Sequence, residues 1–499
     1  MTSGKSKLDL FSTRIAWVVA ATAMCVGTGN MWRFPRIAVM FGGSFMLLYL
    51  IWIFLMSVPI VIVEVYLGRL GRRGPGGSFK YIVGEKYTWM GNFLTMCNTG
   101  ITFYYVVITG WTLYYFLYTA LYGIPSDTMT FWNNLSGNFV IQYVCTLIVI
   151  WLVFAVIWFG IRASMEKVCL VIIPTLFAIL IGLAIYANTL PGSDLGREYY
   201  WLPTVEGLAN AETWLNAFTQ IAWSSGPGWG IFLTMAAYMR LREDINTTSL
   251  SGVLGDTAAG WIAGFIVIPT LFALLPSYAE VLKVAGLGNI GLSFIVFPSL
   301  IATLPGGRII AAFFFFAFFI AAFSSLIWMF EVPIRGFLAD LGVERRKAAL
   351  IFSIACSIAA IPSCYSTNYL WNQDMVWGVG LFIGSLFTLY VALFVLKPHK
   401  IVETTNRYSI FKLGKRWYSA FLWISFIVMI SIFAWWIWQS ATWYPETWWN
   451  PLEIYSPGTM VMQWAIVLAV FIAINKWFNK KLKPEYSTLA AIGKVVEEE

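Results

Sequence analysis

Two apolar segments of this chain are interrupted by short glycine-rich stretches that carry polar side chains. The first interruption is residues 27–30 (Gly-Thr-Gly-Asn), followed by Arg33, and the second is residues 224–228 (Ser-Ser-Gly-Pro-Gly). A broken helix presents free N–H groups and the positive end of a half-helix dipole, which together suit an anion such as a carboxylate. Glycines can also serve only to let helices pack closely. Two breaks in one chain favour a binding site over packing alone.

The elements that must position these breaks are membrane-spanning helices. Hydrophobic residues make up 59% of the chain and charged residues 11%, and the mean hydropathy is +0.74. In lipid, non-helical backbone is tolerated only where protein or a water-filled cavity satisfies its polar groups. Twelve apolar runs reach the length of about 20 residues that crosses ~30 Å of hydrocarbon. They begin near Ile15, Phe45, Thr88, Phe139, Val168, Leu215, Leu250, Arg308, Ala349, Met375, Ala420 and Met460. The predicted fold class is an all-α membrane protein with twelve transmembrane helices.

Basic residues are concentrated in alternate loops and in the two tails. An excess of lysine and arginine marks the cytoplasmic side of a membrane protein, so both termini are predicted to be cytoplasmic. The net charge of +8 is therefore explained by the basic loops of the cytoplasmic side. A nucleic-acid partner is disfavoured because the charges are divided over many short loops. The six cysteines are scattered and indicate no disulfide framework, and the first apolar run does not resemble a removable signal peptide.

The two interrupted segments lie about two hundred residues apart, in corresponding positions of two halves. Such a pair is the sequence sign of an inverted repeat with a binding site between the breaks. The predicted organisation is a cytoplasmic tail (1–12), a first repeat of five helices (13–187), a second repeat of five helices (188–396), two further helices (397–484) and a second cytoplasmic tail (485–499).

Further landmarks follow in order along nearly the whole chain. They are residues 27–35 (Gly-Thr-Gly-Asn-Met-Trp-Arg-Phe-Pro), residues 42–45 (Gly-Gly-Ser-Phe), Glu64, Gly68, Arg69, Tyr104, Tyr105, residues 220–230, Asp256, Ser324, Ser325 and Asp374. Through them the chain resembles the neurotransmitter:sodium symporter family, in particular its bacterial, leucine-transporter-like members. The resemblance implies broken helices one and six, and a sodium-coupled symporter that moves its substrate by alternating access. It also implies that the chain is not an enzyme.

The resemblance implies a binding site for an amino acid. The amides of Thr28 and Gly29 and the hydroxyl of Tyr105 would hold its carboxylate. Monoamine-carrying members have an aspartate where this chain has Gly27, so the expected substrate is an α-amino acid. No pocket position supplies a spare charge, which favours a neutral one. Trp328 is a candidate pocket residue, and the principal substrate-binding set is Met24, Cys25, Thr28, Gly29, Ile101, Tyr105, Trp223, Ser224, Gly226, Trp229, Ser325 and Met329.

Two sodium sites follow from the same resemblance, and both use the oxygen ligands that hard cations prefer. The first would be formed by Cys25, Asn30, Ser224 and Asp256 with the substrate carboxylate. The second would be formed by Ala23, Val26, Ala321, Ser324 and Ser325. The alternative for the two serines is that they bond only to their own helix.

Asp256 departs from the family pattern. Other members carry an asparagine at this position, and animal members bind chloride through positions matching Tyr49, Gln220, Ser224 and Gly260. Glycine at position 260 offers no hydroxyl. We expect the Asp256 carboxylate to supply the negative charge that chloride would bring, so that chloride is not required. A protonated Asp256 bonded to a neighbour is the alternative, because an unpaired charge within a membrane is costly.

The remaining charged residues suggest gates and supports. Arg33 and Asp374 match an outer ion pair of the family, above an aromatic lid of Tyr105 and Trp223. Glu64 and Glu331 are expected to bond broken backbone or a neighbour such as Tyr238. At the inner mouth, the position of the family's arginine falls at Leu8, and the adjacent Lys7 is expected to pair with Asp340.

Several alternatives remain open from the sequence. A non-transporting sensor or a channel of the same fold would share these sites, and the substrate could be an amino-acid-like osmolyte. An enzyme is disfavoured because the single histidine, His399, has no ligand-spaced partner. The compact loops suggest the inner membrane of a prokaryote. The sequence leaves open whether the protein works as a monomer or a dimer.

Overall fold

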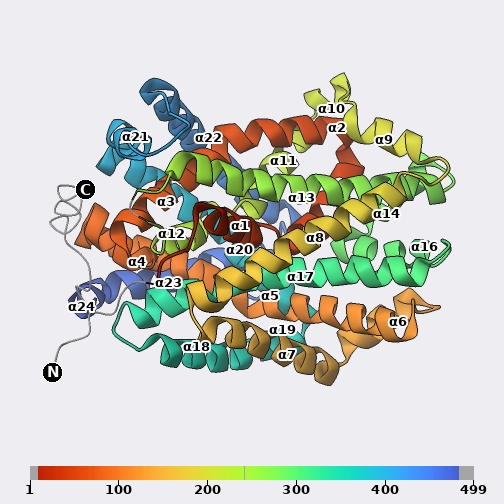
Figure 1. The fold of residues 1–499 in the computed structure, drawn as a ribbon, viewed down its shortest axis with the longest axis horizontal. Coiled ribbons are helices and arrows are strands. Elements are labelled where there is room, and N and C mark those ends of the chain that lie inside the picture. The colour runs from red at the N-terminus through yellow and green to blue at the C-terminus, as the bar shows by residue number, and fades with distance from the viewer. Residues whose placement is uncertain (1–8, 241, 483–499) are drawn as a thin grey trace.

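The computed structural model describes residues 9–240 and 242–482. Within these residues the fold consists of helices and connecting turns, without β-strands. Figure 1 shows most of the long helices running side by side along the longest axis of the molecule. This arrangement agrees with the predicted all-α membrane fold.

The first half of the chain contains both parts of the first interrupted segment. Its elements are α1 (Arg14–Cys25), η1 (Gly29–Arg33), α2 (Phe34–Trp52), η2 (Ile53–Ser57), α3 (Val58–Gly71), α4 (Pro75–Ser78), η3 (Phe79–Val83), η4 (Glu85–Tyr87), α5 (Thr88–Tyr122), α6 (Thr128–Gly137), α7 (Phe139–Trp158), η5 (Ile161–Met165) and α8 (Glu166–Ala187).

The second half contains the second interrupted segment. Its elements are α9 (Ser193–Trp201), α10 (Val205–Ala209), α11 (Ala211–Ser224), α12 (Ile231–Ala236), α13 (Ile245–Leu274), α14 (Tyr278–Gly286), α15 (Gly288–Ile290), η6 (Gly291–Val296), α16 (Phe297–Ile301), α17 (Gly307–Pro333), η7 (Ile334–Ala339), α18 (Arg345–Ala359), α19 (Ile361–Tyr365), α20 (Thr367–Tyr390) and η8 (Val391–Leu396). The chain continues through α21 (Pro398–Asn406), α22 (Lys415–Trp443), α23 (Pro457–Ala473) and α24 (Asn475–Lys481).

Nine helices in the described part of the chain are long and apolar enough to cross a membrane. The bent pair α23 and α24, with a 55° angle between them, would make a tenth span. The first and sixth predicted spans are divided into short helices, and Gly42 (φ 55°) turns the backbone between the first predicted span and the second. The count of twelve stays a prediction, because the broken segments fall below the length of a continuous span.

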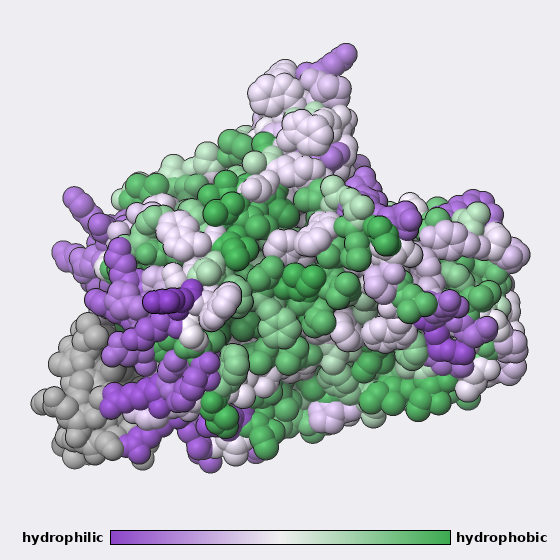
Figure 2. Space-filling view, turned by 90° about the horizontal axis from the view of Figure 1, so that it is seen from above, coloured by the Kyte–Doolittle hydropathy of each residue, from purple (hydrophilic) through white to green (hydrophobic). Residues whose placement is uncertain are grey.

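The loops are distributed between the two ends of the bundle as the charge pattern predicts. In Figure 1, α21, α4 and α24 lie at one end, and α6, α9 and α16 lie at the other. Figure 2 shows a broad hydrophobic band between two ends where hydrophilic residues gather. The core of the bundle is formed around α5, which packs along α17. The apolar window of α5 is 78% buried, whereas that of α22 is only 22% buried and leaves most of its surface for lipid.

Candidate functional site: a pocket between two interrupted helices

The first interruption separates α1 from η1. The backbone leaves the helix at Val26 (φ −74°, ψ 102°). The side-chain oxygen of Asn30 accepts a hydrogen bond from the Gly27 amide at 2.9 Å. The Thr28 amide donates to the Tyr105 hydroxyl at 2.8 Å. The freed backbone groups are therefore held by neighbouring polar side chains, as buried non-helical backbone requires.

The second interruption lies between α11 and α12. Gly226, Gly228 and Gly230 have φ angles of 81°, 82° and 68°, which glycine adopts without the steric cost of a side chain. The Gly228 amide donates to the Glu64 carboxylate at 2.7 Å. This contact confirms the expectation that Glu64 supports broken backbone. The sequence of alternating glycines thus fixes the break locally.

A cavity of about 190 Å³ lies between the two interruptions. Cys25 and Thr28 line it from the first break, and Ser224 and Gly226 line it from the second. Eleven of the twelve predicted substrate-binding residues line this cavity: Met24, Cys25, Thr28, Gly29, Tyr105, Trp223, Ser224, Gly226, Trp229, Ser325 and Met329.

Two predicted pocket residues lie elsewhere. Ile101 is fully buried but does not line the cavity, and Trp328 packs its ring against Phe11 with 5.7 Å between centroids. On α5 the cavity is lined by Tyr104, Tyr105 and Ile108. Ile108 lies three residues after Tyr105 and shares its helix face, but Ile101, four residues before Tyr105, shares that face equally, so the spacing does not distinguish the two. Further lining residues that the sequence interpretation missed include Trp371, Met375, Val379 and Trp436.

The residues predicted for the second sodium converge where α1 meets α17. The Ser324 hydroxyl lies 2.8 Å from the Ala23 carbonyl oxygen and 2.9 Å from that of Ala321. The Ser325 hydroxyl lies 3.0 Å from the Val26 carbonyl oxygen. Each hydroxyl has one proton to donate, so the carbonyl oxygens gathered here outnumber the protons available to them. Both hydroxyls also lie within hydrogen-bonding distance of the Ala321 carbonyl oxygen of their own helix, which is the contact that the alternative predicts. Each hydroxyl in addition contacts a carbonyl oxygen at the end of α1. This excess of acceptors fits a cation.

Asp256 of α13 is fully buried and lies beside both interruptions. Its carboxylate accepts hydrogen bonds from the Asn30 side-chain amide at 2.8 Å and from the Ser224 hydroxyl at 2.9 Å. The Tyr49 hydroxyl is 3.4 Å from its other oxygen. Three predicted ligands of the first sodium therefore come together, and Cys25 lines the adjoining cavity. Among the described residues, no group of three or more His, Cys, Asp or Glu is arranged to hold a metal, but sodium is satisfied by hydroxyl, amide and carbonyl oxygens.

The expected outer ion pair is not formed in this structure. Arg33 and Asp374 both line the cavity, but no charged contact within 4 Å joins them. Arg33 instead donates a hydrogen bond to the Gln220 side-chain oxygen at 2.7 Å. Tyr105 and Trp223 both line the cavity, and the Trp223 ring packs edge-on to Trp229. The aromatic residues thus meet the substrate space as expected, and the charged pair is replaced by a contact between the two interrupted segments.

Charged side chains at the end of the bundle that carries α4 and α24 are held mainly by one another. Asp340 lies 3.0 Å from Arg335 and 3.5 Å from Arg73. Lys7, its expected partner, lies outside the described residues. Glu331 accepts a hydrogen bond from Tyr238, which confirms that expectation.

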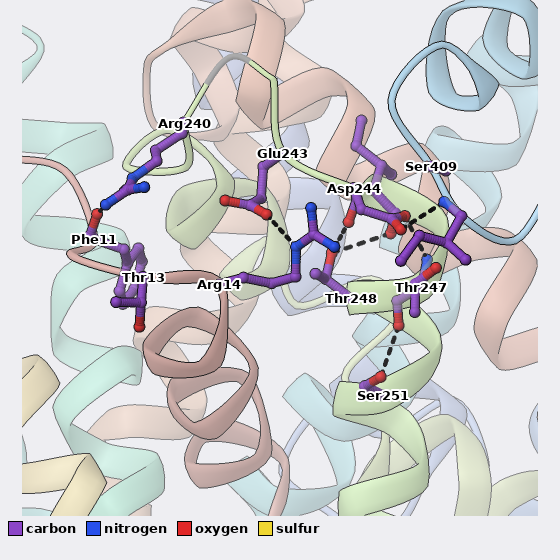
Figure 3. Close-up of polar contacts among 12 residues, drawn as sticks. Phe11, Thr13, Arg14, Arg240, Glu243, Asp244, Thr247, Thr248, Ser251 and Ser409 are labelled. Carbon is purple, nitrogen blue, oxygen red and sulfur yellow. Dashed lines mark hydrogen bonds and ion pairs between the residues drawn. The ribbon is translucent and has the colours of Figure 1, made fainter.

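An ion pair and a backbone hydrogen bond also fix the start of α1 at this end. Arg14 pairs with Glu243 at 2.5 Å, and the Phe11 amide donates to the Tyr238 carbonyl at 3.1 Å. Figure 3 shows Arg14 and Phe11 beside the segment that carries Arg240, Glu243 and Asp244. These contacts hold α1 against the segment that leads into α13.

Comparison with known proteins places these features in a family. The family model described as the sodium:neurotransmitter symporter family matches residues 9–136 and 128–484. An uncharacterized sodium-dependent transporter of Methanocaldococcus jannaschii is 29% identical and covers 82% of this chain and 86% of its own. The sodium-dependent serotonin transporter of Drosophila melanogaster is 24% identical over 94% of this chain and 83% of its own.

A solved structure has the same fold. The crystal structure of MhsT in complex with L-phenylalanine is similar with a TM-score of 0.75, at 24% identity, over 85% of this chain and 99% of that one. The family match extends over both interruptions, both clusters of oxygen groups and the cavity between them. This chain belongs to the sodium:neurotransmitter symporter family and is a sodium-coupled membrane transporter rather than an enzyme.

Proposed function

We propose that this chain imports a neutral α-amino acid together with two sodium ions, by alternating access and without chloride. The supporting observation is the environment of Gly27. A Cβ atom at this position would lie 2.6 Å from the Tyr105 hydroxyl and 2.9 Å from the Ser325 hydroxyl. With these side chains as placed, position 27 has no room for the aspartate that pairs the amine of a monoamine substrate. The Tyr105 hydroxyl accepts from Thr28 and keeps its own proton to donate to a substrate carboxylate.

The lining favours a small zwitterion with an apolar side chain. Met24, Trp229 and Met329 line the cavity together with Gly226, and none of them carries a charge. These three residues offer no partner for a charged substrate side chain, whose burial without one is costly, and the two charged lining residues, Arg33 and Asp374, are assigned to the gate. The fold is shared with MhsT, whose structure contains L-phenylalanine. This likeness supports an amino acid as the substrate.

Two cation sites would couple transport to sodium. The first would use Asp256, Asn30, Ser224 and Cys25 together with the substrate carboxylate, so that ion and substrate share a ligand. The second would use the carbonyl and hydroxyl oxygens that converge at Ser324. Inward movement of each sodium across the membrane potential supplies about 2.3 kcal/mol per 100 mV, in addition to its concentration gradient.

Chloride independence is supported by the surroundings of Asp256. Its carboxylate already meets the Tyr49 and Ser224 hydroxyls, two of the groups that would otherwise face a chloride ion. A Cβ atom on Gly260 would lie 3.1 Å from the Phe34 ring, so that position has little room for another ligand. A fixed carboxylate beside the first sodium gives the site its negative charge without a bound anion.

The second candidate is a sensor or channel of the same fold, or a symporter for an amino-acid-like osmolyte. The test is uptake into proteoliposomes with an imposed inward sodium gradient, using labelled neutral amino acids, taurine and serotonin. We expect saturable accumulation of a neutral amino acid, which stops when potassium replaces sodium and continues when gluconate replaces chloride. Sodium-dependent binding without accumulation would instead establish a sensor, and preferential uptake of taurine or serotonin would overturn the proposed substrate. The expected location is the inner membrane of a prokaryote, with both termini cytoplasmic.

A further inference from the structure

Residues 397–417, which include α21 and the start of α22, carry a concentration of exposed positive charge. This segment contains six basic residues and one acidic residue, Glu403, whereas the whole chain has a net charge of +8. All six basic side chains are exposed: Lys397, Lys400, Arg407, Lys412, Lys415 and Arg416.

These six side chains have no carboxylate partner within 4 Å among the described residues. Lys412 donates to the Asn406 carbonyl, which leaves its positive charge uncompensated and its side chain exposed. Arginines of another loop at the same end behave differently. Arg72 is buried and donates to the Ala237 carbonyl at 3.0 Å, and Arg73 is buried beside Asp340. Those arginines are satisfied within the protein. The exposed charge of residues 397–417 is therefore available to an anion outside it.

Large apolar side chains are exposed among these cations. Ile410, Phe411 and Trp417 are 76%, 51% and 71% exposed. Trp417, Ala420, Ile424 and Ile427 are all exposed and recur at the spacing of one helix face. This face belongs to α22, the candidate span with the smallest buried share in the described chain. A soluble anion would use only the cations, whereas a phospholipid would contact the cations with its headgroup and this face with its acyl chains.

The loop between α21 and α22 is held in one conformation by the start of α13. The Ile410 amide donates to the Asp244 carboxylate at 2.7 Å, and the Phe411 amide donates to the Thr247 hydroxyl at 3.3 Å. The Asn246 side chain donates to the Phe411 carbonyl at 2.9 Å. Figure 3 shows Asp244 between Thr247 and the segment that carries Ser409. Because the backbone of Ile410 and Phe411 is bonded inward, their side chains are presented outward.

We propose that residues 397–417 form a binding site for an anionic phospholipid of the leaflet at this end of the bundle. The headgroup phosphate lies against Lys412, Lys415 and Arg416, and an acyl chain follows the exposed face of α22. Exposed basic residues next to a membrane span attract anionic headgroups, and aromatic side chains such as Trp417 favour the membrane interface. The site is preformed because Asp244 and Thr247 fix the loop.

The test is native mass spectrometry of the full chain released from nanodiscs of phosphatidylcholine mixed with phosphatidylglycerol. We expect the wild type to retain phosphatidylglycerol in preference to phosphatidylcholine. The variant K412Q/K415Q/R416Q should lose this preference, with an apparent affinity lower by on the order of 100-fold at low salt, because each cation contributes about a factor of five. An unchanged melting temperature in detergent would show that the variant is folded.

The matched control is K347Q/K480Q/K481Q, which removes three exposed basic side chains from the helices α18 and α24. It should retain the lipid as the wild type does. An equal loss in both variants would overturn the proposal, because it would indicate general attraction by net charge. Equal retention in wild type and K412Q/K415Q/R416Q would also overturn it. So would full displacement by inorganic phosphate, or a change only in the monomer–dimer ratio, since these would assign the surface to a soluble anion or to a second copy of the chain.

Discussion

The hydroxyl of Ser324 lies 2.8 Å from the carbonyl oxygen of Ala23, across the interface between α17 and α1. The two residues are 301 positions apart and belong to the two predicted repeats. A cation held between them would contact both repeats at once. In the proposed alternating access, release of this cation would remove one link between α1 and α17.

Ser324→Ala is expected to raise the sodium concentration for half-maximal uptake about tenfold, because the loss of one oxygen ligand is worth about 1.4 kcal/mol. Uptake measured against sodium concentration tests this. Ser357→Ala is the control, since the Ser357 hydroxyl bonds only to the Ser353 carbonyl of its own helix, at 2.8 Å. An unchanged sodium dependence in Ser324→Ala would mean that the Ser324 hydroxyl does not bind the ion.

Gly27→Ala is expected to abolish measurable amino-acid binding. The added methyl group would meet the hydroxyls of Tyr105 and Ser325 at distances that force one of them to move. Thermal stabilisation by ligand, which reports binding to the folded state, is the measurement. Gly182→Ala on α8 is the control, because nothing lies within 4 Å of a Cβ there. Normal ligand stabilisation in Gly27→Ala would show that the close approach of Tyr105 and Ser325 to Gly27 is not needed for binding.

Asp256→Asn tests the source of negative charge at the first sodium site. Wild-type uptake should change less than about twofold when gluconate replaces chloride. The variant should need at least about tenfold more sodium, because the neutral amide attracts the cation less than a carboxylate does. Asp194→Asn, at an exposed position on α9, should behave as wild type. A wild-type requirement for chloride would contradict the assignment of this charge to Asp256.

Asp374→Asn is expected to slow uptake at least tenfold while leaving sodium-dependent binding within about threefold. The reason is that Asp374 lines the cavity without touching Arg33 in this structure, so the expected gate requires a movement that brings the two together. Paired measurements of equilibrium binding and of initial uptake rate in the same proteoliposomes separate these effects. Equal losses in both would point to a binding role instead.

Asp244 provides a pH-dependent prediction at the inner end of the bundle. Burial alone would raise the pKa of Asp244, but hydrogen bonds from the Ile410 amide and from Thr247 outweigh it and hold the pKa below its usual value. A carboxyl group with a lowered folded-state pKa stabilises the fold above its unfolded pKa of about 3.9, and this contribution is lost as the pH falls through the folded value. Loop 406–413 should therefore remain protected at neutral pH and open only in acid.

The corresponding variant is Asp244→Ala. It removes an N-cap and should cost about 1 kcal/mol, so that hydrogen exchange of residues 406–413 becomes faster at neutral pH. Exchange in α5 should stay unchanged. The same protection of residues 406–413 in variant and wild type would show that the loop does not depend on this carboxylate.

The sequence was most informative where the residue types do not fit an uninterrupted helix in lipid. Glycines and polar residues inside apolar runs cannot be explained by lipid, so both breaks were predictable from the residues themselves, whereas the two serines of α17 were assigned only through the resemblance to a family. The side of α5 that faces the cavity was not predictable, because Ile101 and Ile108 are both apolar residues one helical turn from Tyr105. Trp328 was misplaced for a similar reason: only the packed structure shows that its ring meets Phe11. The contact of Arg33 with Gln220 was not predictable either, because it joins side chains that are 187 positions apart in the sequence.

The positive φ angles of Gly226, Gly228 and Gly230 have a thermodynamic consequence. Glycine adopts these angles without a steric cost, so the interruption of the second helix does not rely on ligand contacts, and a binding event should not have to melt helical turns. Association should leave the far-ultraviolet circular dichroism signal flat, and the ligand need not compensate the enthalpy of several broken backbone hydrogen bonds.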